Sequence, residues 1–319
     1  MSILDIKDLT INFRSRAGLV HAVQGADLWI EKGQLLGIAG ESGCGKTTTA
    51  LAIPRLLQSN AIISKGEILF NGEDLLKKSE KEMQRYRWKD ISVIFQGAMN
   101  ALNPLKQIGK QIIEPILLHE KKVSAKEAEE RGKELLNQVG IDANRFTNYP
   151  HEFSGGMKQR VMIAMALACK PQLVIADEPV TALDVMIQAQ ILELLRELSK
   201  AYSLSMIMIS HDLSVLSELC DRIAIMYAGK VVEYGDSRKV FTNPKHPYTY
   251  KLMKSLPDIY GEKVAISGIP GYPPSLLELS KGCPFFNRCD MRKAQCAEID
   301  PQLQKYEEDH YSACPVCLL

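Results

Sequence analysis

Residues 40–47 read GESGCGKT, and this stretch decides the fold of the chain. It matches the pattern G-x-x-x-x-G-K-[ST], in which glycines let the backbone curl so that several N–H groups point at phosphate oxygens. The apolar run 34–39, QLLGIA, precedes it and predicts a buried strand, and residues 47–57 after it predict a helix. A strand, a glycine-rich turn and a helix in this order are the context that a phosphate-binding loop needs.

Within this loop we expect Lys46 to reach the β- and γ-phosphates of ATP and the Thr47 hydroxyl to bind Mg²⁺. The N-terminal end of the following helix adds a positive dipole. Cys44 lies close to Lys46, where a thiolate is expected to be favoured. The alternative, a glycine turn that binds nothing, matches the pattern by chance about once in a hundred chains of this length. The candidate nucleotide contacts are Gly40, Glu41, Ser42, Gly43, Cys44, Gly45, Lys46, Thr47 and Thr48.

Two further stretches complete a candidate phosphate site. Residues 173–178 read LVIADE, an apolar strand that ends in two acids, of which Asp177 would hold Mg²⁺ and Glu178 would polarise an attacking water. A capped strand end with two solvated acids is the alternative. In FSGGMKQ, residues 153–159, a second anion site would form at a helix N-terminus from Ser154, Gly155 and Gly156. A helix start that binds nothing is the alternative there.

Outward from these motifs, strands alternate with helices. Strand-like runs at 66–70, 91–95, 173–176 and 206–210 are interspersed with helical patterns at 107–139, 185–201 and 213–219, and a hairpin follows at 222–235. This alternation predicts an α/β core with a parallel sheet. Prolines 244, 247, 257, 270, 273 and 274 then interrupt the chain, so residues 241–319 are expected to form an irregular extension on the core.

Bulk properties exclude several classes of protein. The 319 residues carry a net charge of +1, which is unlike the basic footprint of a nucleic-acid binder. The N-terminus, MSILDIKDLT, does not resemble a secretory signal. The longest apolar stretch, 161–169, is far shorter than the roughly 20 residues of a spanning helix. We therefore expect a soluble chain whose membrane role, if it has one, comes through partners.

Five of the eight cysteines fall between 283 and 317. In a chain without a secretory signal, such a cluster indicates metal chemistry more than disulfides. Four of them follow the spacing C-x₅-C-x₆-C-x₁₇-C, and Cys317 is spare. Four thiolates suit a [4Fe–4S] cluster. Zinc, which favours C-x₂₋₄-C pairs, and disulfides remain alternatives. The four candidate ligands are Cys283, Cys289, Cys296 and Cys314.

A phosphate loop, then Ser-Gly-Gly at a helix start, then an acid pair resembles the ATP-binding cassette (ABC) family over residues 1 to about 240. The resemblance implies a P-loop NTPase core with an antiparallel β subdomain and a helical subdomain at about 97–160. Four further positions then match. Gln96 resembles the glutamine-loop ligand of Mg²⁺ and water, and His211 the switch histidine at the γ-phosphate. Asp184 resembles the residue that crosses the dimer interface, and Phe13 the aromatic side chain on adenine.

Ordinary structural roles are the alternatives at these positions: a polar strand end for Gln96, a helix N-cap for Asp184 and core packing for Phe13. The resemblance implies a head-to-tail dimer in which ATP is bound between the phosphate loop of one subunit and the Ser-Gly-Gly motif of another. It gives a catalytic set of Glu178, His211, Lys46 and Gln96, with Thr47, Gln96 and Asp177 as the Mg²⁺ ligands.

Three stretches narrow the resemblance to the ATPases of dipeptide and oligopeptide importers: QGAMNALNPLKQIGKQI (96–112), NPKHPYTYKLMKSLP (243–257) and IPGYPPSLLELSKGCPFFNRC (269–289). With them it covers essentially the whole chain. In that family such a tail carries an iron–sulfur cluster. The implied partners are two permease subunits, a second homologous ATPase and an extracytoplasmic peptide-binding protein, with no nucleic acid. The implied location is the cytoplasmic face of the cell membrane.

Four other functions compete with peptide import. The chain could serve an importer of another cargo, such as nickel or a sugar oligomer. A non-transport ABC ATPase of DNA repair or translation is disfavoured by the neutral charge and by the single cassette. In a P-loop kinase for a small molecule, the Ser-Gly-Gly motif and His211 would have no role. An exporter is disfavoured by the importer-like tail.

Overall fold

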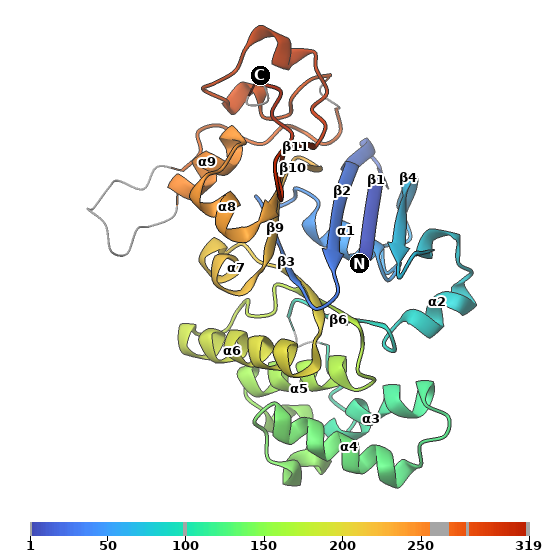
Figure 1. Ribbon diagram of the computed structural model, residues 1–319. Helices are drawn as coiled ribbons and strands as arrows, with labels where there is room; N and C mark the ends of the chain where they lie inside the picture. The colour runs from blue at the N-terminus through green and yellow to red at the C-terminus, as the bar shows by residue number, and fades with distance from the viewer. Residues whose placement is uncertain (1, 98–100, 256–267, 279–280, 317–319) are drawn as a thin grey trace. The chain divides into compact units, whose positions relative to one another are not determined.

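The computed structural model describes residues 2–97, 101–255, 268–278 and 281–316, and Figure 1 traces them. The chain forms two compact units. The first unit comprises Met1–Ile30, Leu35–Leu76 and Ser210–Leu319, and the second comprises Glu31–Gln34 and Lys77–Ile209. These units are made of several chain segments each, and their boundaries differ from the expected domains 1–240 and 241–319, which stay a prediction.

An antiparallel sheet in the first unit has the strand order β2-β1-β4-β5. Its strands are β1 (Ser2–Ser15), β2 (Gly18–Glu31), β4 (Ala61–Phe70) and β5 (Glu73–Asp74). Apolar side chains on one face, among them Leu4, Ile6 and Phe70, are buried. Of these strands, the sequence located only part of β4.

The first unit also contains the strands β11-β12-β10-β9-β3 in that order. The strand β3 (Leu35–Ala39) runs parallel to β9 (Arg222–Tyr227), and β9 forms the predicted hairpin with β10 (Lys230–Asp236). Every residue of β3 and β9 is buried. The helix α1 (Lys46–Ala52) follows β3, so the stretch 40–45 bridges a fully buried strand and a helix.

The second unit contains the parallel strands β8-β7-β6, which are β6 (Ile91–Ile94), β7 (Leu173–Asp177) and β8 (Ser205–Ile209). All residues of β7 and β8 are buried, which explains their unbroken apolar sequences. Parallel strands end at the same edge of a sheet, so the residues that follow β6 and β7 are neighbours. This places the predicted polar positions 96 and 178 together.

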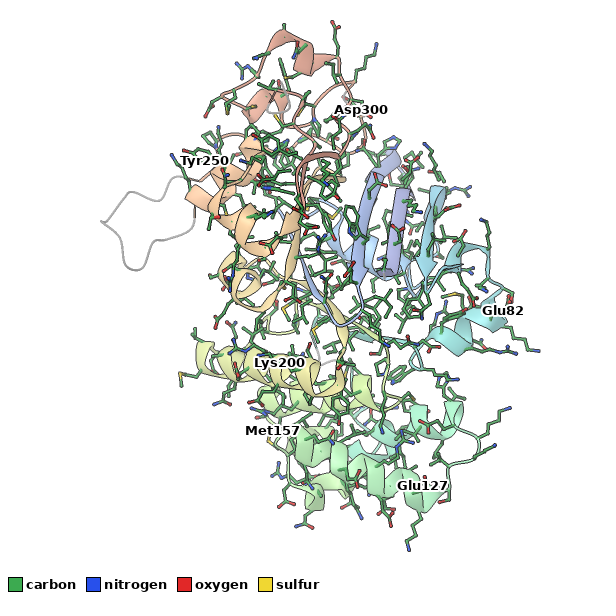
Figure 2. The ribbon with its side chains drawn as sticks, viewed as in Figure 1. Glu82, Glu127, Met157, Lys200, Tyr250 and Asp300 are labelled. Carbon is green, nitrogen blue, oxygen red and sulfur yellow. The ribbon has the colours of Figure 1, made fainter. Side chains whose placement is uncertain are left out.

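Helices make up most of the rest of the second unit. The predicted helical stretch 107–139 forms two helices, α3 and α4, which are separated at residues 120–124 and pack against each other (Figure 1). Glu127, labelled in Figure 2, lies in the first turn of α4. The helical elements of this unit are α2 (Glu80–Tyr86), α3 (Ile108–His119), α4 (Ala125–Gln138), η3 (Ala143–Thr147), η4 (Pro150–Glu152), α5 (Gly155–Leu167) and α6 (Val185–Tyr202), and the short η1 (Leu75–Lys77) precedes them at the end of a first-unit segment.

The C-terminal extension is more regular than its prolines predicted. Pro247 occupies the first turn of α9, where a missing N–H costs nothing, and the His246 ring nitrogen Nδ1 accepts the Tyr248 N–H as a cap. The proline therefore begins a helix here. The elements from residue 213 onward, apart from β9 and β10, are α7 (Leu213–Leu219), α8 (Ser237–Thr242), α9 (Pro247–Lys254), η5 (Phe286–Arg288), η6 (Ala294–Ala297), β11 (Gln304–Glu307) and β12 (His310–Ser312).

Across the described ranges, none of the helices has both the length and the apolar character needed to cross a bilayer.

Candidate functional site

The phosphate loop between β3 and α1 depends on its glycines. Gly40, Gly43 and Gly45 have φ values of +145°, +78° and +102°. A Cβ atom on Gly40 would lie 2.1 Å from the carbonyl oxygen of Met226, and one on Gly45 would lie 2.4 Å from that of Ala22. The loop therefore needs both the backbone freedom and the small size of glycine at these two positions.

Lys46 is buried within this loop. Its Nζ donates to the carbonyl oxygens of Gly40 at 2.8 Å and Glu41 at 3.0 Å, so the ammonium group lies against the loop whose N–H groups would bind phosphate. Thr47 and Thr48 follow in the first turn of α1. The strand, the glycine loop and the helix thus follow in the predicted order, although α1 ends at Ala52 and not at residue 57, and the phosphate contacts of Lys46 and Thr47 stay a prediction.

The expectation that Cys44 favours a thiolate is wrong. Its side chain is buried in the loop, and burial raises the pKa of the Cys44 thiol, although the nearby charge of Lys46 acts in the opposite direction. Desolvation of a thiolate outweighs one neighbouring cation here, so the neutral thiol is favoured.

The structure brings two predicted catalytic residues together in the second unit. The Gln96 side-chain amide donates to the Glu178 carboxylate at 2.7 Å, and the Thr181 hydroxyl donates to the same oxygen at 2.9 Å. Gln96 and Glu178 lie just beyond the ends of the parallel neighbours β6 and β7. Asp177, the last residue of β7, is buried. A carboxylate and an amide thus lie together at the edge of the sheet where β6 and β7 end.

Glu178 has an unusual backbone. Its φ is +46°, and its N–H donates to the Ile209 carbonyl oxygen at 3.0 Å. A left-handed conformation outside glycine is sparsely populated and costs about 1–3 kcal/mol, and such residues concentrate at functional sites. The conformation sets the direction in which the carboxylate leaves the end of β7. The sequence carried no signal for it.

Ser154 and Asp184 both cap helices, which is the ordinary structural role considered for each, and their roles at an ATP site stay a prediction. The Ser154 hydroxyl accepts the Met157 N–H at the start of α5, and the Asp184 carboxylate accepts the Ile187 N–H at the start of α6. Figure 2 labels Met157 in that first turn. A Cβ on Gly156 would lie 2.7 Å from the Ile187 side chain, so close packing of α5 on α6 requires this glycine.

Two further residues predicted to contact the nucleotide, Phe13 and His211, belong to the first unit. Phe13 is half-buried on β1, opposite Ala61 of β4, and His211 is exposed near the N-terminus of α7.

Sequence reasoning missed two residues that contact the phosphate loop from the extension. The Tyr248 hydroxyl accepts the Glu41 N–H, and the Arg288 guanidinium binds the Glu41 carboxylate. They lie 207 and 247 residues away from Glu41 along the chain, where no local pattern can reveal them.

The four predicted cysteine ligands line one pocket of the extension, together with His246 and Phe285. Burial is the main cause that raises the pKa of Cys283, to about 11, and the three other thiols raise it further. Yet no group of three or more His, Cys, Asp or Glu side chains in the described ranges is arranged to hold a metal ion. The predicted iron–sulfur or zinc character of the extension is thus unsupported by this geometry. Cys317 lies outside the described residues.

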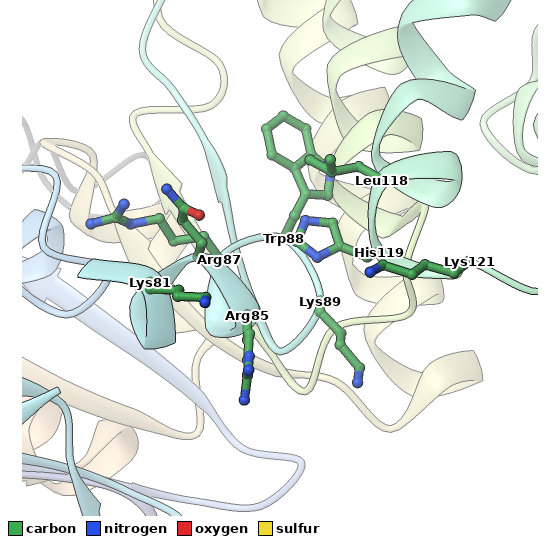
Figure 3. A pocket seen from close by; sticks show the side chains of 9 residues that line it. Lys81, Arg85, Arg87, Trp88, Lys89, Leu118, His119 and Lys121 are labelled. Atoms are coloured by element: carbon green, nitrogen blue, oxygen red, sulfur yellow. The ribbon is translucent and has the colours of Figure 1, made fainter. Parts of the chain in front are cut away.

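A cavity of about 560 Å³ in the second unit lies apart from these residues. Figure 3 shows cationic side chains around it, beside Trp88 and His119. None of the predicted nucleotide-site residues lines it. Its lining residues are Lys81, Gln84, Arg85, Arg87, Trp88, Lys89, Leu118, His119 and Lys121.

Comparison with known proteins agrees with this geometry. Residues 23–181 match the family model described as ABC transporter, and residues 232–296 match the one described as oligopeptide/dipeptide transporter, C-terminal region. A solved structure of the ATP-binding cassette MJ0796, bound to ADP and Pi, superposes with a TM-score of 0.66 at 27% identity. That match covers 74% of this chain and 99% of the other.

Relatives extend over nearly the whole chain. The oligopeptide transport ATP-binding protein OppD of Bacillus subtilis is 47% identical, over 97% of this chain and 87% of its own. OppD of Escherichia coli is 45% identical, over 98% and 93%. The dipeptide transport ATP-binding protein DppD of Lactococcus lactis is 45% identical, over 97% and 89%.

The fold, the phosphate loop and these matches define an ATPase of the ABC class, which uses ATP and Mg²⁺. Within that class, the chain belongs to the family of ATP-binding proteins of oligopeptide and dipeptide transporters.

Proposed function

We propose that this chain hydrolyses ATP to power the import of dipeptides or oligopeptides across the cytoplasmic membrane. The contact between Gln96 and Glu178 carries the catalytic part of the proposal. It holds a carboxylate and an amide at the edge where β6 and β7 end, and the left-handed backbone of Glu178 fixes the direction of the carboxylate. Full-length similarity to peptide-transport ATPases supports the cargo class.

In this proposal each side chain has a defined task. Lys46 neutralises charge on the β- and γ-phosphates from within the loop, and the loop N–H groups bind the remaining phosphate oxygens. Thr47, Asp177 and Gln96 would hold Mg²⁺, which would neutralise charge on the phosphate oxygens. The Glu178 carboxylate accepts a proton from the attacking water, which the Gln96 amide orients.

The remaining predicted positions would complete the nucleotide site. His211 would contact the γ-phosphate, and Phe13 would stack on adenine. The start of α5, with Ser154 as its cap and Gly155 and Gly156 in its first turn, would bind the γ-phosphate of ATP held by a second subunit. Asp184 would lie at the interface with that subunit. ATP binding then closes the pair of subunits, and hydrolysis loosens it.

The experiment replaces Glu178 by glutamine. Glu178→Gln keeps the shape and one acceptor oxygen for the Gln96 amide and the Thr181 hydroxyl but removes the base, and loss of one general base lowers the rate by about 10²–10⁴-fold. We expect ATP hydrolysis to fall by this factor while binding of ATP persists. Glu197→Gln, on an exposed position of α6, is the matched control and keeps wild-type turnover. Wild-type turnover in Glu178→Gln would refute the catalytic role.

The proposed partners are two permease subunits, a second homologous ATPase and an extracytoplasmic peptide-binding protein, at the cytoplasmic face of the membrane. Membership of the peptide-transporter family supports this set, because its members are named as the ATP-binding components of transport systems. Co-expression with the permease subunits and affinity purification of this chain test it. Recovery of the chain without any membrane subunit would contradict the proposal.

We also propose that Cys283, Cys289, Cys296 and Cys314 bind a [4Fe–4S] cluster. All four thiols line one pocket, and burial together with the three other thiols raises the pKa of Cys283, so a positively charged group would be needed to hold it as a thiolate. Zinc is the alternative, but zinc sites favour C-x₂₋₄-C pairs. These four cysteines contain no such pair, and their spacing C-x₅-C-x₆-C-x₁₇-C supports a cluster with one iron for each thiolate.

Anaerobic purification followed by metal analysis and absorbance spectroscopy tests this assignment. We expect about four iron atoms per chain and a brown chromophore that Cys289→Ser removes. A colourless protein with one zinc, or with no metal, would overturn the iron–sulfur assignment.

A further inference from the structure

We infer that Arg288 of the C-terminal extension is a positioning residue for the phosphate loop, and that through it the extension sets the affinity of the loop for ATP. The inference rests on the proposed function of the loop as the ATP site. Arg288 and the loop both belong to the first unit.

The contact is a two-pronged ion pair. Arg288 Nη1 and Nη2 each lie 2.9 Å from one carboxylate oxygen of Glu41, the second residue of the loop. The Arg288 side chain is 6% exposed and that of Glu41 is 23% exposed. Bidentate pairs of this kind fix direction as well as distance, so the orientation of the Glu41 side chain follows that of Arg288.

Arg288 is itself rigidly held. Its Nε donates to the Pro270 carbonyl oxygen at 3.0 Å, Nη2 also donates to that of Ile269 at 3.0 Å, and Nη1 also donates to the Tyr227 hydroxyl at 3.2 Å. Together with the two bonds to Glu41, these interactions use all five N–H donors of the guanidinium. A side chain fixed at five points can act as a rigid support for the residue it binds.

Glu41 is fixed at all three of its polar groups. Arg288 binds the carboxylate, the Tyr248 hydroxyl accepts the N–H at 3.0 Å, and Lys46 Nζ donates to the carbonyl oxygen at 3.0 Å. Two of these three partners, Arg288 and Tyr248, come from the extension. The extension thus holds the residue whose carbonyl group binds the phosphate-loop lysine.

Arg288 of the extension thus contacts Glu41, and Glu41 contacts Lys46, the proposed phosphate ligand. If Glu41 is released, the loop backbone and the Lys46 side chain are no longer held in one conformation. Part of the binding free energy of ATP must then be used to order the loop. Preorganisation of this kind changes the affinity for ATP more than the rate of the chemical step. If the ion pair only held the extension in place, its loss would not change the affinity for ATP in this way.

The experiment compares the KM for ATP, kcat and the Kd of a fluorescent ATP analogue among variants of the full-length chain. We expect Arg288→Ala to raise KM and Kd about tenfold with kcat changed less than about threefold, and Arg288→Lys to restore part of the affinity. Glu41→Ala should match Arg288→Ala, and the double variant should be no worse than either single one, because both remove the same interaction.

Asp309→Ala is the matched control. It removes another ion pair between the extension and the sheet, that of Asp309 with Arg222 of β9, without contacting the loop. We expect it to leave KM unchanged. An unchanged KM in Arg288→Ala, additive effects of the two single variants, or an equal rise of KM in Asp309→Ala would each overturn the inference.

Lys46→Ala separates this inference from the function on which it rests. If Lys46→Ala abolishes binding of the ATP analogue while Arg288→Ala binds it normally, the loop is the ATP site and only the role of Arg288 is refuted. If Lys46→Ala binds the analogue normally, the proposed ATP site itself is refuted.

Discussion

His310 on β12 and Glu233 on β10 are hydrogen-bonded inside the protein, with His310 Nε2 2.7 Å from Glu233 Oε1 and both side chains fully buried. The Glu233 carboxylate also accepts the backbone N–H groups of Lys245 at 2.6 Å and His246 at 2.9 Å. One buried carboxylate thus joins the C-terminal strand and the segment before α9 to the hairpin strand β10.

Removal of the imidazole should therefore destabilise the first unit. His310→Ala leaves the buried Glu233 side chain without one of its hydrogen-bond partners, and such a loss costs about 1–3 kcal/mol. Urea unfolding monitored by tryptophan fluorescence measures the loss, because Trp29 packs against Tyr311 with ring centroids 4.9 Å apart. His151→Ala, at an exposed position, is the control. Equal midpoints for wild type and His310→Ala would contradict the role of this pair.

The sequence predicted those elements whose signals are local. The phosphate loop, the buried strands β3, β7 and β8 and the helix caps each lie within one short stretch, where glycine spacing, apolar runs and capping residues can be recognised. The helix α9 was missed because prolines were interpreted as breaks, although Pro247 stands at a helix start, where it is tolerated.

Contacts between distant stretches could not be predicted in this way. The Gln96–Glu178 hydrogen bond arises from the pairing of β6 with β7, and the Arg288–Glu41 pair joins residues 247 positions apart. The left-handed backbone of Glu178 follows from the turn after β7 and has no signature in side-chain type. Such features depend on tertiary packing and appear only in the folded chain.

A second prediction concerns pH. Burial lowers the pKa of His246 from its ordinary value of 6.5 to about 4, although the charge of Glu233 acts in the opposite direction. Between these two values the unfolded chain binds a proton that the folded chain excludes, so the stability is full above pH 6.5 and is lost as the pH falls toward 4. For this group alone the loss amounts to about 2 kcal/mol between pH 7 and pH 5.

Urea unfolding of wild type and His246→Asn at pH 7, 6 and 5 tests this contribution. Asparagine cannot titrate but can still cap α9 through a side-chain oxygen, as the His246 nitrogen Nδ1 does. We expect His246→Asn to lose less stability than the wild type over this pH range. Parallel pH profiles for the two proteins would show that His246 does not contribute.

A third prediction compares two glycines of the phosphate loop. Gly40→Ala would place a Cβ 2.1 Å from the Met226 carbonyl oxygen, whereas a Cβ on Gly43 has no neighbour within 4 Å. Both have positive φ values, so each substitution carries a backbone cost of about 1–3 kcal/mol, and only Gly40→Ala adds a collision with the backbone. In ATP titrations we expect Gly40→Ala to lose detectable binding and Gly43→Ala to bind about tenfold more weakly. Equal affinities would contradict the packing of this loop.

Peptide uptake by the reconstituted transporter measures the central claim most directly. Proteoliposomes that contain this chain with the proposed permease subunits, second ATPase and peptide-binding protein should accumulate a radiolabelled tripeptide only when ATP is supplied on the side of this chain. Replacement of Glu178 by glutamine should reduce that accumulation sharply, although ATP still binds. ATP hydrolysis by the wild-type complex without accumulation of any dipeptide or oligopeptide would contradict the account.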